Sequence, residues 1–150
     1  MRLPHLRPFD RDPLYLITAC IAGRRELLAN STAHAILSAV WTRSAEIDGW
    51  FIGRYLLMLD HIHLFARPTR TAKPLAQWIK TWKSISSREL SRALNVPSPI
   101  WQPNYFDHFI RSSQSYSEKW DYVSANPVRK NLVSRPSDWP WQGEIHSVRF

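Results

Sequence analysis

Short apolar runs along the chain predict four strands. Leu14 to Ala22 is apolar and rich in β-branched and aromatic residues, which is typical of a buried strand. Trp50 to Leu59 and His61 to Arg67 predict a second and a third strand, with Asp60 at a tight turn or bulge between them. The aromatic segment Ile100 to Ile110 is expected to contain the fourth strand.

Three other segments repeat their apolar residues with the spacing of one helical face. The first helix is expected to follow the capping residues 30–32 (Asn-Ser-Thr) and to end near Ile47. The second covers residues 75–94. The third begins at Ser112 or Ser113 and continues to about Ala125, because the proline two residues later ends or kinks a helix.

The element order strand–helix–strand–strand–helix–strand predicts an α+β fold with a ferredoxin-like split βαβ arrangement and a central antiparallel sheet. At 150 residues the chain is expected to form one domain over residues 1–150. Residues 1–13 contain three prolines and predict an irregular arm, and residues 134–150 are expected to form a tail over the surface. This fold hosts many functions and names none.

Charge narrows the possible partners. The chain has 20 basic and 12 acidic residues, a net charge of +8 and an isoelectric point near 10.2. Such a balance in a small domain suggests nucleic acid or another anionic surface. Since the charges are spread along the chain, the alternative is that arginine-rich composition merely reflects a GC-rich genome.

Several classes are disfavoured. The single cysteine, Cys20, excludes an intramolecular disulfide framework. No secretion signal is visible, and the longest apolar stretches are too short to span a bilayer. We therefore expect a soluble, cytoplasmic protein with no membrane partner.

His61 and His63 form a His-x-His pair within the third predicted strand. Side chains two residues apart in a strand point to the same face, about 6–7 Å apart at the backbone, so both imidazoles can converge on one metal ion. The alternative is that both histidines are polar residues on a half-exposed strand.

Tyr122 and Asn126 lie four residues apart, on one face of the third predicted helix. A phenol can act as a nucleophile, and an amide oxygen can ligate a hard cation. The alternative is that Tyr122 is half-buried in the core and that Asn126 caps the helix before the proline. Tyr116 is a second phenol, on a different face.

Together these segments make the chain similar to the single-tyrosine HUH transposases (IS200-like), and most similar to the REP-associated tyrosine transposases of bacteria. The matching residues are Arg24-Arg25, Gly49-Trp50, Tyr55 to Leu64, Ile100 to Gln102, Asp107 to Ser112, Asp121 to Val133 and Ser137 to Trp141. The resemblance covers about residues 14–142. One departure is Leu59-Asp60, where many members have Pro-Asn before the His-x-His pair.

The resemblance implies a ferredoxin-like or RRM-like domain with helices on one face of the sheet and a C-terminal helix that carries the nucleophile. It assigns His61 and His63 as metal ligands, Tyr122 as nucleophile and Asn126 as the residue that completes the metal site. The implied reaction is metal-dependent cleavage and strand transfer of single-stranded DNA at REP-like hairpins through a 5′-phosphotyrosine. Mg²⁺ or Mn²⁺ fits this chemistry. The resemblance also implies a bacterial, nucleoid-associated protein that acts as a monomer or a homodimer.

Basic and aromatic residues supply candidate DNA contacts. For phosphates the candidates are Arg24, Arg25, Lys73, Lys80, Lys83, Arg111 and Arg129. For base stacking they are Trp101, Tyr105 and Trp141, with core packing as the alternative for each.

Two other functions stay open from the sequence. One is a domesticated relative that binds DNA hairpins without cutting them. The other is a histidine-metal phosphoesterase that uses water in place of Tyr122.

Overall fold

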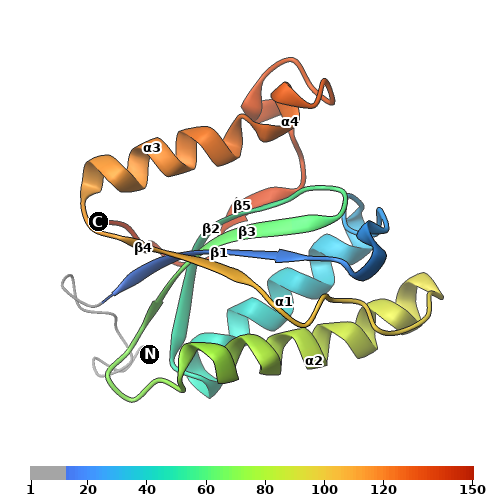
Figure 1. Ribbon diagram of the computed structural model, residues 1–150, viewed down its shortest axis with the longest axis horizontal. Helices are drawn as coiled ribbons and strands as arrows, with labels where there is room; N and C mark the ends of the chain where they lie inside the picture. The colour runs from blue at the N-terminus through green and yellow to red at the C-terminus, as the bar shows by residue number, and fades with distance from the viewer. Residues whose placement is uncertain (1–12) are drawn as a thin grey trace.

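The computed structural model describes residues 13–150 and confirms the α+β class (Figure 1). Its elements are β1 (Leu14–Cys20), η2 (Ala22–Arg24), α1 (Ser31–Ile47), β2 (Trp50–Leu57), β3 (His61–Pro68), α2 (Leu75–Leu94), β4 (Phe106–Ile110), α3 (Ser113–Ser124), α4 (Asn126–Arg129), η3 (Pro136–Asp138) and β5 (Gln142–Glu144). Except for Pro13, the arm expected at residues 1–13 lies outside the described residues. Within residues 13–150, no helix has both the length and the apolar character needed to cross a bilayer.

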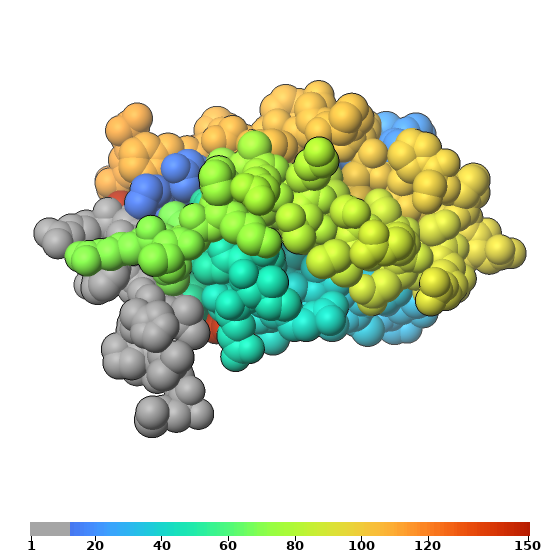
Figure 2. All heavy atoms as spheres, turned by 90° about the horizontal axis from the view of Figure 1, so that it is seen from below, coloured from blue at the N-terminus to red at the C-terminus, as the bar shows by residue number. Residues whose placement is uncertain are grey.

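The five strands form one sheet in the order β4-β1-β3-β2-β5, and all neighbours are antiparallel. The first four strands in this order form the split βαβ arrangement that the element order predicts. Helices α1 and α2 cover one face of the sheet, and α3 crosses the opposite face (Figure 1). Seen from below, α1 and α2 lie side by side over their face (Figure 2).

Both faces of the sheet are packed, which explains the many tryptophans. Under α1 and α2, three tryptophans are fully buried, and Trp50 stacks on Trp78 with ring centres 4.7 Å apart. Under α3, Phe65 of β3 packs against Tyr116 with ring centres 4.4 Å apart. The second contact attaches α3 to the sheet.

Side-chain caps begin two of the predicted helices. The Asn30 side chain accepts a hydrogen bond from the Ala33 amide at 2.8 Å, and the Ser112 hydroxyl accepts one from the Ser115 amide at 3.0 Å. Each bond satisfies a backbone donor that the first helical turn leaves without a partner. The predicted start of each of these helices is therefore confirmed.

The interpretation of residues 134–150 as a surface tail is wrong for part of the segment, although most of its residues are exposed. Three of its residues form β5 on the edge of β2. Trp139 is buried, and its indole N–H donates to the Leu57 carbonyl at 2.8 Å. A side chain at Gly143 would meet the Tyr55 hydroxyl at 2.7 Å, so glycine permits this close approach.

Candidate functional site

The two histidines of β3 project from the sheet face that α3 covers. Their neighbours Ile62 and Leu64 pack into the core on the α1 and α2 face. The His61 and His63 ring centres lie 5.0 Å apart, with the ring planes at 88°. The predicted shared orientation of the pair is confirmed.

Each imidazole is held through its Nδ1 atom. His61 Nδ1 lies 2.8 Å from the Asp60 carboxylate, and His63 Nδ1 lies 2.8 Å from the Thr18 hydroxyl. Thr18 lies directly opposite His63 in the β1–β3 register. Because both Nδ1 atoms are occupied, the Nε2 atom of each ring is the one presented to a ligand, as in many protein metal sites.

Electrostatics keep His63 neutral and Asp60 ionised. Burial, together with the charges of His61 and Arg129, lowers the pKa of His63 to about 3. Burial alone would raise the pKa of Asp60, but hydrogen bonds from Arg24 and His61 outweigh burial and lower it. A neutral imidazole is the form that binds a metal ion.

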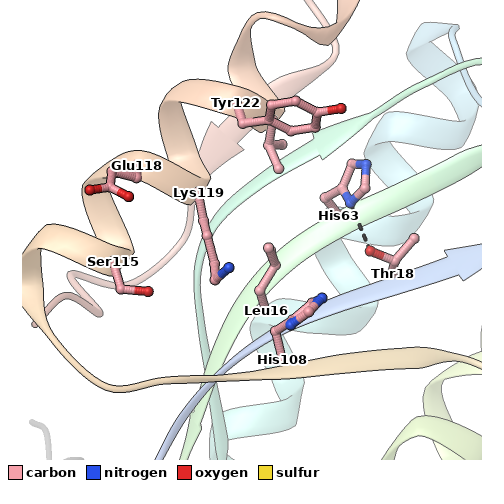
Figure 3. A pocket seen from close by; sticks show the side chains of 9 residues that line it. Leu16, Thr18, His63, His108, Ser115, Glu118, Lys119 and Tyr122 are labelled. Atoms are coloured by element: carbon pink, nitrogen blue, oxygen red, sulfur yellow. Dashed lines mark hydrogen bonds between the residues drawn. The ribbon is translucent and has the colours of Figure 1, made fainter.

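Tyr122 projects from α3 into the same cleft as His63 (Figure 3). This cleft has a volume of about 430 Å³ and is lined by Leu16, Thr18, His63, His108, Ser115, Glu118, Lys119, Tyr122 and Val123. Tyr122 is 69% exposed, so the alternative of a half-buried core residue is wrong. The Arg129 guanidinium lies 3.9 Å from the centre of the Tyr122 ring.

Tyr116 lacks this access. Its side chain is buried against Phe65, and its hydroxyl has no hydrogen-bond partner among residues 13–150. Burial raises the pKa of the Tyr116 phenol. Of the two phenols on α3, only that of Tyr122 faces the cleft.

Asn126 begins α4, because α3 ends at Ser124 and the helix breaks at Ala125. It is half-buried and is not among the residues that line the cleft. In the described part of the chain, no group of three or more histidine, cysteine, aspartate or glutamate side chains could hold a metal.

Several basic residues predicted to contact DNA have partners within the protein. Arg24 donates to Asp60 at 2.8 Å, and Lys73 pairs with buried Asp48 at 2.6 Å. Arg25 donates to the backbone carbonyls of residues 22, 97 and 99 and so holds the loop before β4.

Lys83 is buried, and its ammonium donates to the Gln102 and Asn104 carbonyls at 2.8 and 2.7 Å. Burial lowers its pKa to about 8. Two of the three N–H donors of the ammonium are therefore used within the protein, and the assignment of Lys83 as a phosphate contact stays a prediction. Lys80, Arg111 and Arg129 remain exposed.

The predicted stacking residues are less accessible than expected. Trp101 is buried, and its indole donates to the Ser86 hydroxyl at 2.9 Å, so its assignment as a stacking platform is wrong. Tyr105 and Trp141 are half-buried. Phe106 of β4 is 60% exposed.

Sequence reasoning missed His108 and Lys119, which line the cleft with Tyr122. It also missed Phe106, which lies two residues before His108 on the same face of β4. Two patterns in the sequence could have identified these residues. Side chains two apart in β4 share one face, and Lys119 lies one helical turn from Tyr122.

Comparison with protein families gives a match over residues 13–126 to the model described as transposase IS200-like. Among curated proteins, the chain is 28% identical over 140 residues to a REP-associated tyrosine transposase of Escherichia coli K12. That match covers 90% of this chain and 78% of the relative.

Solved structures share the fold. A REP-associated tyrosine transposase bound to a REP hairpin matches with a TM-score of 0.69 and 22% identity, over 95% of this chain and 82% of the other. A proposed transposase of Deinococcus radiodurans R1 matches with a TM-score of 0.58 and 17% identity, over 88% of this chain and 98% of the other.

Proposed function

We propose that this chain, which belongs to the IS200-like transposase family, cuts and rejoins single-stranded DNA beside a hairpin through a covalent bond to Tyr122. The observation that carries the proposal is the cleft shared by two side chains. One is the exposed phenol of Tyr122, and the other is the neutral imidazole of His63. This pairing supports the proposal that Tyr122 is the nucleophile and that His63 is a metal ligand.

The choice of DNA rests on charge and on relatives. A net charge of +8 favours a polyanion. The E. coli relative is named for its association with REP elements, and one structural neighbour is bound to a REP hairpin. We extend hairpin recognition to this chain on that basis.

The residues present fit a divalent metal. Both imidazoles are oriented by Nδ1 partners, and His63 is neutral. His61 and His63 would hold the ion, with Asn126 as the proposed third ligand. Bound there, Mg²⁺ or Mn²⁺ would polarise a non-bridging oxygen of the scissile phosphate.

The chain's own part in the reaction is nucleophilic. The Tyr122 oxygen attacks phosphorus and loses its proton, while the bond from phosphorus to the 3′ oxygen breaks and that oxygen leaves as a protonated hydroxyl. The product is a 5′-phosphotyrosine. Attack by a 3′-hydroxyl on this linkage reverses the step and joins the strands without ATP.

Arg129 positions the nucleophile. Its guanidinium lies 3.9 Å from the centre of the Tyr122 ring, which is a cation–π distance. This contact restrains the Tyr122 ring in the cleft.

The test uses single-stranded DNA that carries a palindrome from the DNA flanking the gene. With Mn²⁺, the wild-type protein is expected to form an SDS-stable adduct, and Tyr122→Phe is expected to form none. Tyr116→Phe is the matched control, because it removes a phenol one to two turns earlier on the same helix, and it should retain the adduct.

Other outcomes reject the proposal in distinguishable ways. Salt-dependent binding without any adduct would indicate a hairpin-binding protein that does no chemistry. Cleaved but unlinked products, unaffected by Tyr122→Phe, would indicate water as the nucleophile.

A further inference from the structure

The cleft extends past Tyr122 to side chains that the proposed reaction does not use. Lys119 extends from α3 toward the sheet, and His108 lies on the opposite wall, on β4 (Figure 3). These elements are adjacent in the chain, yet they form two separate walls. Both side chains therefore face a ligand that enters between α3 and the sheet.

Lys119 forms no ion pair with the one carboxylate that lines this cleft, that of Glu118. Lys119 is half-buried, and no hydrogen bond or ion pair of its ammonium occurs within residues 13–150. The neighbouring carboxylate of Glu118 instead accepts a hydrogen bond from Gln114 at 2.9 Å. A partly buried cation without an anionic partner favours an anionic ligand. Lys119 also lies one helical turn before Tyr122. An anion bound by Lys119 would therefore lie next to the nucleophile.

Strand register places an exposed aromatic side chain beside this pair. Phe106 lies opposite Thr18, and His108 lies opposite Leu16, so both β4 residues share the face on which Thr18 contacts His63. Phe106 is 60% exposed at the edge of the sheet. An exposed aromatic ring there offers a stacking surface for an unpaired base.

We infer that Lys119, His108 and Phe106 form a subsite for a nucleotide adjacent to the scissile phosphate. Lys119 and His108 bind its phosphate, and Phe106 stacks on a neighbouring base. The inference rests on the proposed function for its location beside a scissile bond. The binding of single-stranded DNA by these three residues is a separate claim that does not require cleavage.

The test measures binding in EDTA, so that no cleavage occurs. The probe is a fluorescein-labelled oligothymidylate of about 12 nucleotides, within the range that small single-strand-binding domains cover. Fluorescence anisotropy against salt concentration gives both the affinity and its salt dependence.

Phe106→Ala should weaken binding by about fivefold or more, because loss of base stacking has effects of this size. Phe109→Ala is the matched control: this phenylalanine is also exposed on β4 but packs against Tyr15 on the other face. It should bind like the wild type. Equal affinities for Phe106→Ala and wild type would overturn the stacking role.

Lys119→Ala and His108→Ala should both weaken binding, and Lys119→Ala should reduce the salt slope by about 0.7, the value for one phosphate contact to a single strand. Arg43→Ala removes the same charge from α1, across the sheet, and should leave the slope unchanged. An unchanged slope in Lys119→Ala would overturn the phosphate role, as would failure of the wild type to bind the probe.

A further arm separates a DNA phosphate from free phosphate. Inorganic phosphate at matched ionic strength should not displace the probe. If it displaces the probe from the wild type but not from Lys119→Ala, the site binds free phosphate and the nucleotide assignment is wrong.

The two proposals fail separately. If the adduct forms while the subsite variants bind like wild type, the proposed function stands and the subsite is wrong. If these variants lose binding while no adduct forms, the subsite stands and the proposed chemistry is wrong.

Discussion

Replacing Thr18 with valine should weaken metal binding without changing any of the proposed ligands. The Thr18 hydroxyl lies 2.8 Å from Nδ1 of His63. Valine keeps the β-branched shape that suits β1 and removes only the hydroxyl. The half-buried His63 ring then loses the contact that orients its Nε2 atom.

The expected loss is about 10- to 100-fold in metal affinity, or about 1.4–2.8 kcal/mol, as is typical when the partner of a ligating histidine is removed. The loss of a hydrogen-bond partner by a buried polar atom costs a similar amount, about 1–3 kcal/mol. Titration of Mn²⁺ followed by electron paramagnetic resonance of the free ion measures this affinity directly.

Thr18→Ser restores a hydroxyl and should recover most of the affinity. Thr42→Val makes the same chemical change on exposed α1, where the hydroxyl donates to the Ser38 carbonyl, and should have no effect. Unchanged Mn²⁺ affinity in a folded Thr18→Val protein would refute the role given to this contact.

Three further predictions concern stability and rate. Tyr116→Phe should raise the free energy of unfolding by about 1 kcal/mol, because it removes a buried hydroxyl that has no partner within residues 13–150. Burial raises the pKa of Tyr116 above 10.0, so Tyr116 ionises in the unfolded chain first, and the wild type should lose stability above that pH while the variant loses less. Urea denaturation at neutral and alkaline pH tests both effects. A variant that is less stable than the wild type at neutral pH would contradict the first effect. Gly49→Ala should lower the melting temperature more than Gly23→Ala: both glycines have positive φ, but only at Gly49 would the new Cβ lie 2.7 Å from a backbone atom, that of Ala72. Equal melting temperatures would contradict this. Arg129→Ala should slow adduct formation about two- to fivefold in single-turnover assays, because an exposed cation–π interaction has effects of this size. Arg129→Lys should slow adduct formation less. An unchanged rate in Arg129→Ala would contradict the positioning role of Arg129.

Local rules predicted the parts of the site that lie within one element. His61 and His63 share a face because a strand has a period of two, and this holds wherever the strand packs. Helix starts at Asn30 and Ser112 depend on a hydroxyl or amide oxygen within one turn, which the sequence displays.

Other features depend on contacts between distant segments. The three residues of β5 have no apolar alternation and become a strand only through pairing with β2. Lys83 and Trp101 are a basic and an aromatic residue, the types expected at a DNA-binding surface. The packing of α2 against the loop before β4 buries both side chains.

Two features of the candidate site also depend on contacts between distant segments and could not be predicted from the sequence. Thr18 becomes the partner of His63 only through the β1–β3 register, across 45 residues of chain. The exposure of Phe106 follows from the place of β4 at the sheet edge. Neither property is visible from spacing along the chain.

Mapping the residue that carries the covalent DNA tests the central claim most directly. Trypsin separates the two phenols of α3, because residues 112–119 and 120–129 fall in different peptides, with Tyr116 in the first and Tyr122 in the second. After reaction with Mn²⁺ and nuclease trimming, mass spectrometry should find the nucleotide remnant on the peptide of residues 120–129 alone. A remnant on residues 112–119, or on neither peptide while the DNA is cut, would contradict the assignment of Tyr122 as the nucleophile.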